Sequence, residues 1–142
     1  MKRGEASAIG VQHWAEDYLG RAWENGAEGP DAYDCWGLVR AVLRDRFGIA
    51  LPAVNVDALA PLAVRRAFRD SGEYDHWQEI DAPVVEGDVV LMSHAKHVHH
   101  IGLWTAGGVL HAVEGAGVVH QHLQSLRMHG WNVVSVYRRK TA

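Results

Sequence analysis

The chain contains one cysteine, Cys35, and ten histidines, and these residue types together can support nucleophilic chemistry. A thiol acts as a nucleophile when a neighbouring base takes its proton, and histidine commonly serves as that base. Most of the histidines lie in the second half of the chain: His94, His97, His99, His100, His111, His120, His122 and His129. Because a lone cysteine cannot form a disulfide within the chain, Cys35 is either a small buried hydrophobe or a nucleophile.

Cys35 begins the clearest helix that the sequence predicts, over Cys35–Phe47. Asp34 suits the N-cap of this helix, and Gly48 suits the position just after its end. The unpaired N–H groups and the positive dipole end at a helix N-terminus are expected to lower the pKa of the thiol and to stabilise an oxyanion. Gly37 disfavours the first turn, so we expect it to allow close approach of a neighbour or a substrate. The apolar stripe of the helix has i, i+3 and i+4 spacing: Leu38, Val39, Val42, Leu43 and Phe47.

The sequence TAGG predicts a β-hairpin that brings two histidines together. If Thr105 lies opposite Gly108, then His111 lies opposite Gly102. His100 shares a face with Gly102 because side chains of a strand alternate with period two. His100 and His111 are therefore expected to lie diagonally on one face, about 7–8 Å apart at the backbone, with Gly102 leaving the space between them empty.

The other histidines have weaker claims on this site. His99 is expected to point to the opposite face, and His94 and His97 are expected in a polar loop before the strand. His120 and His122 share one face of a later strand, where they are either solvated or line a substrate groove. The HVHH and HQH sequences offer imidazoles to a metal, but a zinc site needs three or four suitably spaced ligands and no HExxH or CxxC spacing occurs. We therefore expect no metal.

Length and composition predict one domain over residues 1–142, with 48% apolar residues to build a core. The net charge of −3 gives no broad basic face, so we do not expect nucleic acid as a partner. No apolar run follows Lys2 and Arg3, so no signal peptide is expected, and no stretch approaches the ~18 apolar residues that span a bilayer. We expect synthesis in the cytoplasm and no membrane insertion.

The element pattern predicts an α+β fold, with N-terminal helices packed on a small antiparallel sheet. Besides the helix at Cys35, helices are expected over Val11–Leu19 and Pro61–Phe68, an irregular surface loop over 21–33, and an extended segment over 49–59. The expected strands are Val89–Met92, His99–Trp104, Val109–Val113, Val118–Leu123 and Asn132–Tyr137. Three tryptophans are candidates for contacts with other proteins, although single aromatic residues are more often in the core: Trp14, Trp77 and Trp131.

Four short sequence boxes resemble the NlpC-type cell-wall cysteine peptidases, a papain-like group, over about Trp14 to Tyr137. The boxes are Asp34-Cys35-Trp36-Gly37-Leu38-Val39, Gly87-Asp88-Val89-Val90, His100-Ile101-Gly102-Leu103-Trp104 and Leu110-His111-Ala112. In order, they are similar to the family's nucleophile box, its Gly-Asp strand start, its base motif and the position of its third, orienting residue. Trp36 stands where serine is more frequent, as in branches associated with phage tails.

The resemblance implies a papain-like fold and hydrolysis of peptidoglycan stem peptides, typically at the γ-D-glutamyl to diamino-acid bond, without a cofactor. Cys35 would be the nucleophile, His100 its base and His111 the residue that orients the base. The implied oxyanion and substrate residues are Trp23, Tyr33, Asp34, Trp36, Gly37 and Gly102. Many members have a tyrosine before the nucleophile box where Trp23 stands here, and Tyr33 lies elsewhere in the pattern.

Three hypotheses of function follow. The first is a peptidoglycan-cleaving peptidase in a phage tail tip or gene-transfer particle, which carries it to the periplasmic cell wall. The second is a structural or assembly component of a tail tip, bound to other tail-tip proteins, whose catalytic site is incidental. The third is a thiol acyltransferase or amidase with another substrate, because one fold can host several such reactions.

Overall fold

The helix expected behind Cys35 is present as α2, Cys35–Phe47, in the computed structural model, which describes residues 13–51, 63–70, 76–81, 84–95 and 97–140. Asp34 is its N-cap, and the Asp34 carboxylate accepts a hydrogen bond from the Gly37 N–H. Gly48 ends the helix in the left-handed conformation, at φ 68°. Both ends of the helix therefore form as their capping residues predict.

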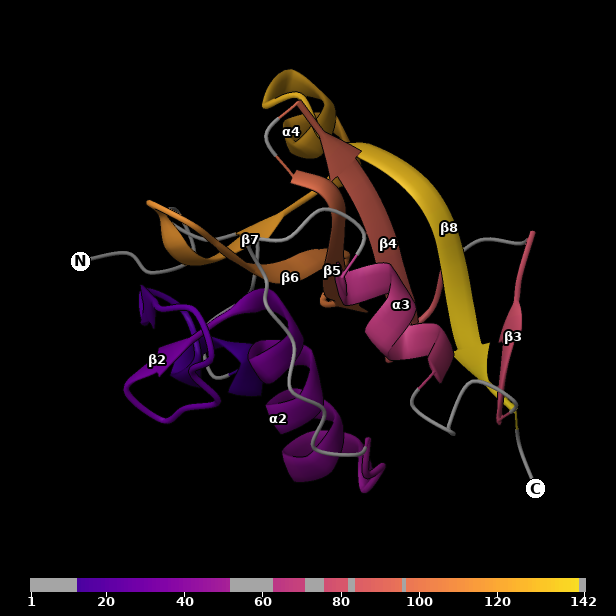
Figure 1. The fold of residues 1–142 in the computed structure, drawn as a ribbon, viewed down its shortest axis with the longest axis horizontal. Coiled ribbons are helices and arrows are strands. Elements are labelled where there is room, and N and C mark those ends of the chain that lie inside the picture. The colour runs from indigo at the N-terminus through magenta and orange to yellow at the C-terminus, as the bar shows by residue number, and fades with distance from the viewer. Residues whose placement is uncertain (1–12, 52–62, 71–75, 82–83, 96, 141–142) are drawn as a thin grey trace.

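The remaining elements complete the expected α+β architecture (Figure 1). The helical elements are the 3-10 helix η1, Trp14–Asp17, and the α-helices α3, Ala63–Asp70, and α4, Leu123–Met128. The strands are β1 Ala22–Trp23, β2 Ala32–Tyr33, β3 Trp77–Glu79, β4 Val89–His94, β5 His97–Thr105, β6 Gly108–Val113, β7 Gly117–Gln121 and β8 Asn132–Arg139. In the main sheet the strand order is β3-β8-β4-β5-β6-β7, and each neighbouring pair is antiparallel.

Both faces of this sheet are covered by apolar side chains. Strand β4 illustrates the alternation: Val89 and Leu91 join the core cluster beneath α2, whereas Val90 and Met92 join a second cluster with Leu126 of α4. Helices α2 and α3 pack against β5, and α2 also contacts β6. In Figure 1, α4 lies at the opposite end of the sheet from α2. The continuous apolar run of β4 follows from this burial on two sides.

The Gly87–Asp88 pair fixes the start of β4. Asp88 is 1% exposed, and its carboxylate accepts hydrogen bonds from Arg138 Nε at 3.0 Å and Arg138 Nη2 at 2.9 Å. It also accepts the Val85 N–H at 2.9 Å. Gly87, at φ 90°, packs on the ring of Phe47 at the end of α2. The pair thus ties β8 and α2 to the strand that follows it.

Several expected elements differ from the structure. The irregular loop over 21–33 contains β1 and β2, which form a parallel pair with Trp23 opposite Tyr33. The helix expected over Val11–Leu19 is one 3-10 turn in its described part, and most of the extended segment over 49–59 lies outside the described residues. The helix expected from Pro61 is observed from Ala63 to Asp70, and Pro61 also lies outside.

The strand expected over Val118–Leu123 ends earlier, at Gln121. The prediction of strand at Leu123 is wrong, because His122 is an extended N-cap and Leu123 begins α4. Burial of Leu126 holds that short helix against Trp131. The short edge strand β3 was not expected, and Trp77 on it is buried rather than available for contacts.

Candidate active site

His100 and His111 are joined by a hydrogen bond between their rings, with 2.9 Å from His100 Nε2 to His111 Nδ1. Both side chains are buried, at 3% and 0% exposure. The expected register of the hairpin is observed, because Thr105 pairs with Gly108 and the ladder continues to Leu103 and Leu110. The diagonal relationship predicted from strand parity therefore brings the two imidazoles into contact.

Trp131 covers this histidine pair. Its indole stacks on the His100 ring, with centroids 4.6 Å apart and planes at 30°, and meets the His111 ring edge-on at 5.3 Å. The ring of His94 lies 4.8 Å from the same indole. Trp131 is 5% exposed, so the expectation of a tryptophan available for contacts with other proteins is wrong here. An indole in this position keeps water from the hydrogen bond between the rings, which strengthens it.

The Cys35 thiol is buried in the core cluster that also holds Ile101, the β5 residue that directly follows His100. Among the described residues, the β5–β6 ladder does not continue past Leu103 and Leu110, and the backbone N–H of Ile101 on β5 is one of the groups that act on the thiol. The bond between the two histidine rings connects β5 and β6 just beyond the last pair of this ladder.

The expected lowering of the thiol pKa is not observed. Burial, followed by the nearby Asp34 carboxylate, raises the pKa of Cys35 from 9.0 to about 12. Backbone N–H groups of Ile101, Trp36 and Cys35 oppose this rise and do not overcome it. The helix N-terminus favours the thiolate, but the loss of water around a side chain that is 3% exposed outweighs it. The resting thiol is consequently protonated at neutral pH.

Asp34 and Gly37 fasten the loop before α2. The Asp34 carboxylate accepts the Gly37 N–H and the Gly26 N–H, each at 2.7 Å, and burial raises the pKa of this group against the effect of those bonds. A Cβ added to Gly37 would collide with the Ala27 carbonyl oxygen. The close neighbour that the glycine admits is therefore the backbone at Ala27, which also accepts the Asp34 N–H at 3.0 Å.

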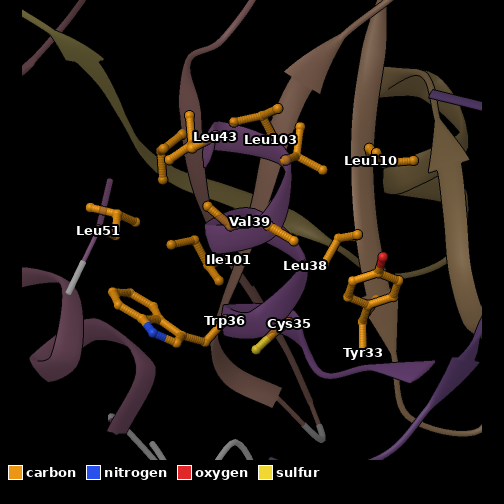
Figure 2. Packing of buried hydrophobic residues seen from close by; sticks show 14 of the residues in the cluster. Tyr33, Cys35, Trp36, Leu38, Val39, Leu43, Leu51, Ile101, Leu103 and Leu110 are labelled. Atoms are coloured by element: carbon orange, nitrogen blue, oxygen red, sulfur yellow. The ribbon is translucent and has the colours of Figure 1, made fainter. Parts of the chain in front are cut away.

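The aromatic residues expected near an oxyanion are mostly part of the core. Tyr33 is 5% exposed and its ring lies 5.9 Å from that of Tyr18. Figure 2 shows its hydroxyl directed away from Cys35. Trp36 is 2% exposed and points toward Leu51 in the same view. Trp23 is partly buried and packs on the core cluster from β1.

Gly102 lies between the histidine-bearing positions, as expected. A Cβ added there would come within 2.5 Å of Val109 Cγ1 and 3.1 Å of His111 Cβ. The absence of a side chain at position 102 is what lets the His111 side chain occupy this face of the hairpin.

The remaining histidines take structural positions. The loop expected at His94 and His97 is instead the end of β4 and the start of β5, where these residues pair. His120 lies opposite Leu110, on the other face of β6–β7 from His111, and its Nε2 donates to the Thr105 carbonyl at 2.8 Å. Burial lowers the pKa of His120. His122 is exposed at the start of α4.

One contact of the pair was missed from the sequence. Gln121 Oε1 lies 2.8 Å from His111 Nε2, on the side of the ring away from His100. Extending the parity argument by one strand would have found it, because Gln121 pairs with Val109 and so shares the face of His111. Trp131 has no such signal, since it follows a helix that the sequence did not predict.

Within the described ranges, no group of three or more His, Cys, Asp or Glu side chains is placed to hold a metal ion. The described helices include none long and apolar enough to span a membrane. What the arrangement offers chemically is a buried thiol at the start of α2 and, on β5 and β6, one imidazole that a second imidazole orients.

Comparison with known proteins connects this geometry to one family. The model of the NlpC/P60 family matches residues 20–138. The tail tip assembly protein K of Escherichia phage N15 is 34% identical over 84 residues, which are 55% of this chain and 33% of that protein. The chain thus spans about a third of the length of this relative.

Solved structures share the fold. NlpC1 from Trichomonas vaginalis aligns over 96% of this chain and 48% of its own, with a TM-score of 0.60 and 19% identity. NlpC2 from the same organism aligns over 90% and 44%, with a TM-score of 0.59 and 22% identity. A lipoprotein-like NLP/P60 protein from Staphylococcus aureus aligns over 90% and 39%, with a TM-score of 0.59 and 24% identity.

Proposed function

Because the chain belongs to the NlpC/P60 family, we propose that it is a thiol peptidase of the bacterial cell wall, with Cys35 as nucleophile and His100 as base. Family members are generally cell-wall peptidases. The observation that carries the proposal is the buried hydrogen bond between His100 and His111, next to Ile101, whose backbone N–H acts on the Cys35 thiol. A thiol, a base and a residue that orients the base are the parts that this chemistry needs.

In the proposed mechanism, His100 takes the thiol proton through Nδ1, because its Nε2 is engaged by His111. The sulfur forms a bond to the substrate carbonyl carbon, and the N–H groups in the first turn of α2 stabilise the oxyanion. The imidazolium then returns the proton to the leaving amine, and water hydrolyses the thioester. Because burial raises the pKa of the resting thiol, the proposal has the proton pass to His100 as the sulfur attacks.

The proposed substrate is the peptidoglycan stem peptide, at the γ-D-glutamyl to diamino-acid bond. The proposed setting is a phage tail tip or related gene-transfer particle that opens the wall locally and binds other tail-tip proteins. The similarity to a phage tail tip assembly protein supports this setting. Nothing in the proposal requires a metal or a cofactor.

The test is digestion of purified peptidoglycan, with the released muropeptides identified by mass spectrometry. We expect stems truncated after D-glutamate, and no such product from Cys35→Ala or His100→Ala. Unchanged muropeptides with correctly folded protein would count against the peptidase. A product in which the acyl group has passed to an amine, instead of to water, would indicate an acyltransferase.

The name of the phage relative favours a second candidate, a component needed for tail assembly. Particles made with Cys35→Ala separate the two roles. Normal particles that deliver DNA poorly through an intact wall support the peptidase. Normal delivery by Cys35→Ala particles, together with failed assembly when the chain is deleted, supports the assembly role alone.

A further inference from the structure

We propose that Gln121 is a positioning residue that sets which ring nitrogens of His111 and His100 carry protons. The inference rests on the proposed function, because it concerns the base of that same site. It extends the site beyond Cys35, His100 and His111 to a fourth side chain on β7.

The geometry forms a chain of contacts across three strands. Gln121 Oε1 lies 2.8 Å from His111 Nε2, and His111 Nδ1 lies 2.9 Å from His100 Nε2. At the other end, Gln121 Nε2 donates to Ser125 Oγ of α4 at 3.1 Å. The amide is thus held at both of its ends, with its oxygen toward the histidines.

This arrangement determines the tautomers one after another. An amide oxygen only accepts hydrogen bonds, so His111 Nε2 must carry a proton. A neutral His111 then has an unprotonated Nδ1, which accepts from the Nε2–H of His100. His100 is left with its lone pair on Nδ1, the nitrogen that is not committed to His111. That is the tautomer a base needs.

The opposite orientation of the amide would give an inactive tautomer. An NH₂ group facing His111 would make His111 Nε2 the acceptor, place the proton on Nδ1, and turn His100 Nε2 into an acceptor. A neutral His100 would then hold its proton on Nδ1 and could not take one from Cys35. One side chain on β7 therefore decides whether the imidazole can act as the base.

The choice of an amide rather than a carboxylate also has a consequence. Glutamate at this position would accept from His111 in the same way, but its negative charge would favour protonated imidazoles and raise their pKa. Gln121 supplies the acceptor without the charge. Among the described residues, other titratable groups near the pair include His94, across the Trp131 indole, and His129, whose Nδ1 lies 3.3 Å from the Gln121 amide nitrogen.

The first experiment reads the tautomers without a substrate. Two-bond ¹H–¹⁵N spectra of the histidine rings should show His111 and His100 both protonated on Nε2 in the wild type at neutral pH. Gln121→Met should mix the tautomers of His111, whereas Gln121→Glu should keep them and raise the pH at which the pair titrates. Gln124→Met, an exposed glutamine on α4, is the matched control and should change neither.

The second experiment measures kinetics on the peptidoglycan stem peptide. Gln121→Met should lower kcat about 10-fold or more with KM nearly unchanged. Gln121→Glu should recover most of kcat, with the acidic limb of the pH profile moved upward. A His111 protonated on Nδ1 in the wild type, or Gln121→Glu as inactive as Gln121→Met, would overturn the proposal. If the spectra show the expected tautomers but the stem peptide is not hydrolysed, the peptidase function is wrong and the role assigned to Gln121 still holds.

Discussion

Gly102 faces His111 across the hairpin so closely that a Cβ on Gly102 would lie 3.1 Å from the Cβ of His111. The nearest atom to that added carbon would be Val109 Cγ1, at 2.5 Å. Real Cβ atoms do not tolerate the shorter distance, so β6 must move away from β5 for a side chain to fit. The His100–His111 bond crosses the strands at this point, and its length depends on their separation.

Gly102→Ala should therefore lower both stability and the order of the histidine pair. Overpacking of a tight core site costs about 1–3 kcal/mol of unfolding free energy, measurable by urea denaturation. Val109→Ala removes the first atom that the new methyl group meets. We expect the double variant to be less destabilised than the sum of the two single variants by about 1 kcal/mol. Strict additivity would show that the clash is not with Val109.

Cys35 should make the protein less stable at alkaline pH. The folded-state pKa of about 12 lies above the ordinary value of 9.0, so between these values the unfolded chain releases the thiol proton while the folded chain keeps it. The unfolded state then binds fewer protons, and the free energy of unfolding falls as pH rises. The stabilisation by the neutral buried thiol is fully present below pH 9.

The measurement compares the wild type with Cys35→Ala from pH 8 to pH 10.5 by urea unfolding. The wild type should lose about 1.4 kcal/mol per pH unit more than the variant above pH 9. Other groups that titrate in this range, including the tyrosines, affect both proteins and cancel in the difference. Parallel curves would indicate a thiol with an ordinary pKa in the fold.

Asp34→Asn should lower the pKa of the Cys35 thiol and destabilise the helix. The Asp34 carboxylate is the second cause of the raised thiol pKa, after burial, and an amide carries no charge. The amide also accepts at only one of its two ends, so one of the Gly26 and Gly37 N–H bonds is lost, at about 1 kcal/mol.

Alkylation by iodoacetamide as a function of pH gives the thiol pKa of this variant. The midpoint for Asp34→Asn should lie below that of the wild type. Val42→Ala is the control, because it weakens the same helix without removing a charge and should leave the midpoint unchanged. An equal shift in both variants would assign the effect to local opening of α2.

The parts of the site that could be predicted depend on local signals. The helix Cys35–Phe47 is specified by an apolar period and by caps at both ends, which lie within the same short segment. The hairpin register follows from a two-residue turn, in which Ala106 and Gly107 both have positive φ, at 52° and 80°. From that register, strand parity alone places His100 and His111 on one face.

The unpredicted parts depend on contacts distant in sequence. Nothing local ends β7 at Gln121, since α4 is stabilised by burial of Leu126 against Trp131. The β1–β2 pair has only two residues in each strand, which is too short to show a period. The predicted direction of the shift in the thiol pKa was wrong for a similar reason. A helix N-terminus is visible in a sequence, whereas the burial that outweighs it is a property of the whole fold.

Arg138→Met should destabilise the fold more than removal of both partners of the Arg138–Asp88 pair. Asp88 is 1% exposed on its side chain, so loss of the guanidinium leaves a buried carboxylate that still accepts the Val85 N–H but has lost its counter-charge. We expect a clear loss in the free energy of unfolding, smaller than for a fully buried pair because Arg138 is 33% exposed. In Arg138→Met with Asp88→Asn, the uncompensated charge is gone and part of that loss should be recovered.

Arg127→Met, on the exposed face of α4, is the matched control and should change the urea midpoint little. If Arg138→Met were no more destabilising than this control, the pair would not be what joins β8 to the start of β4.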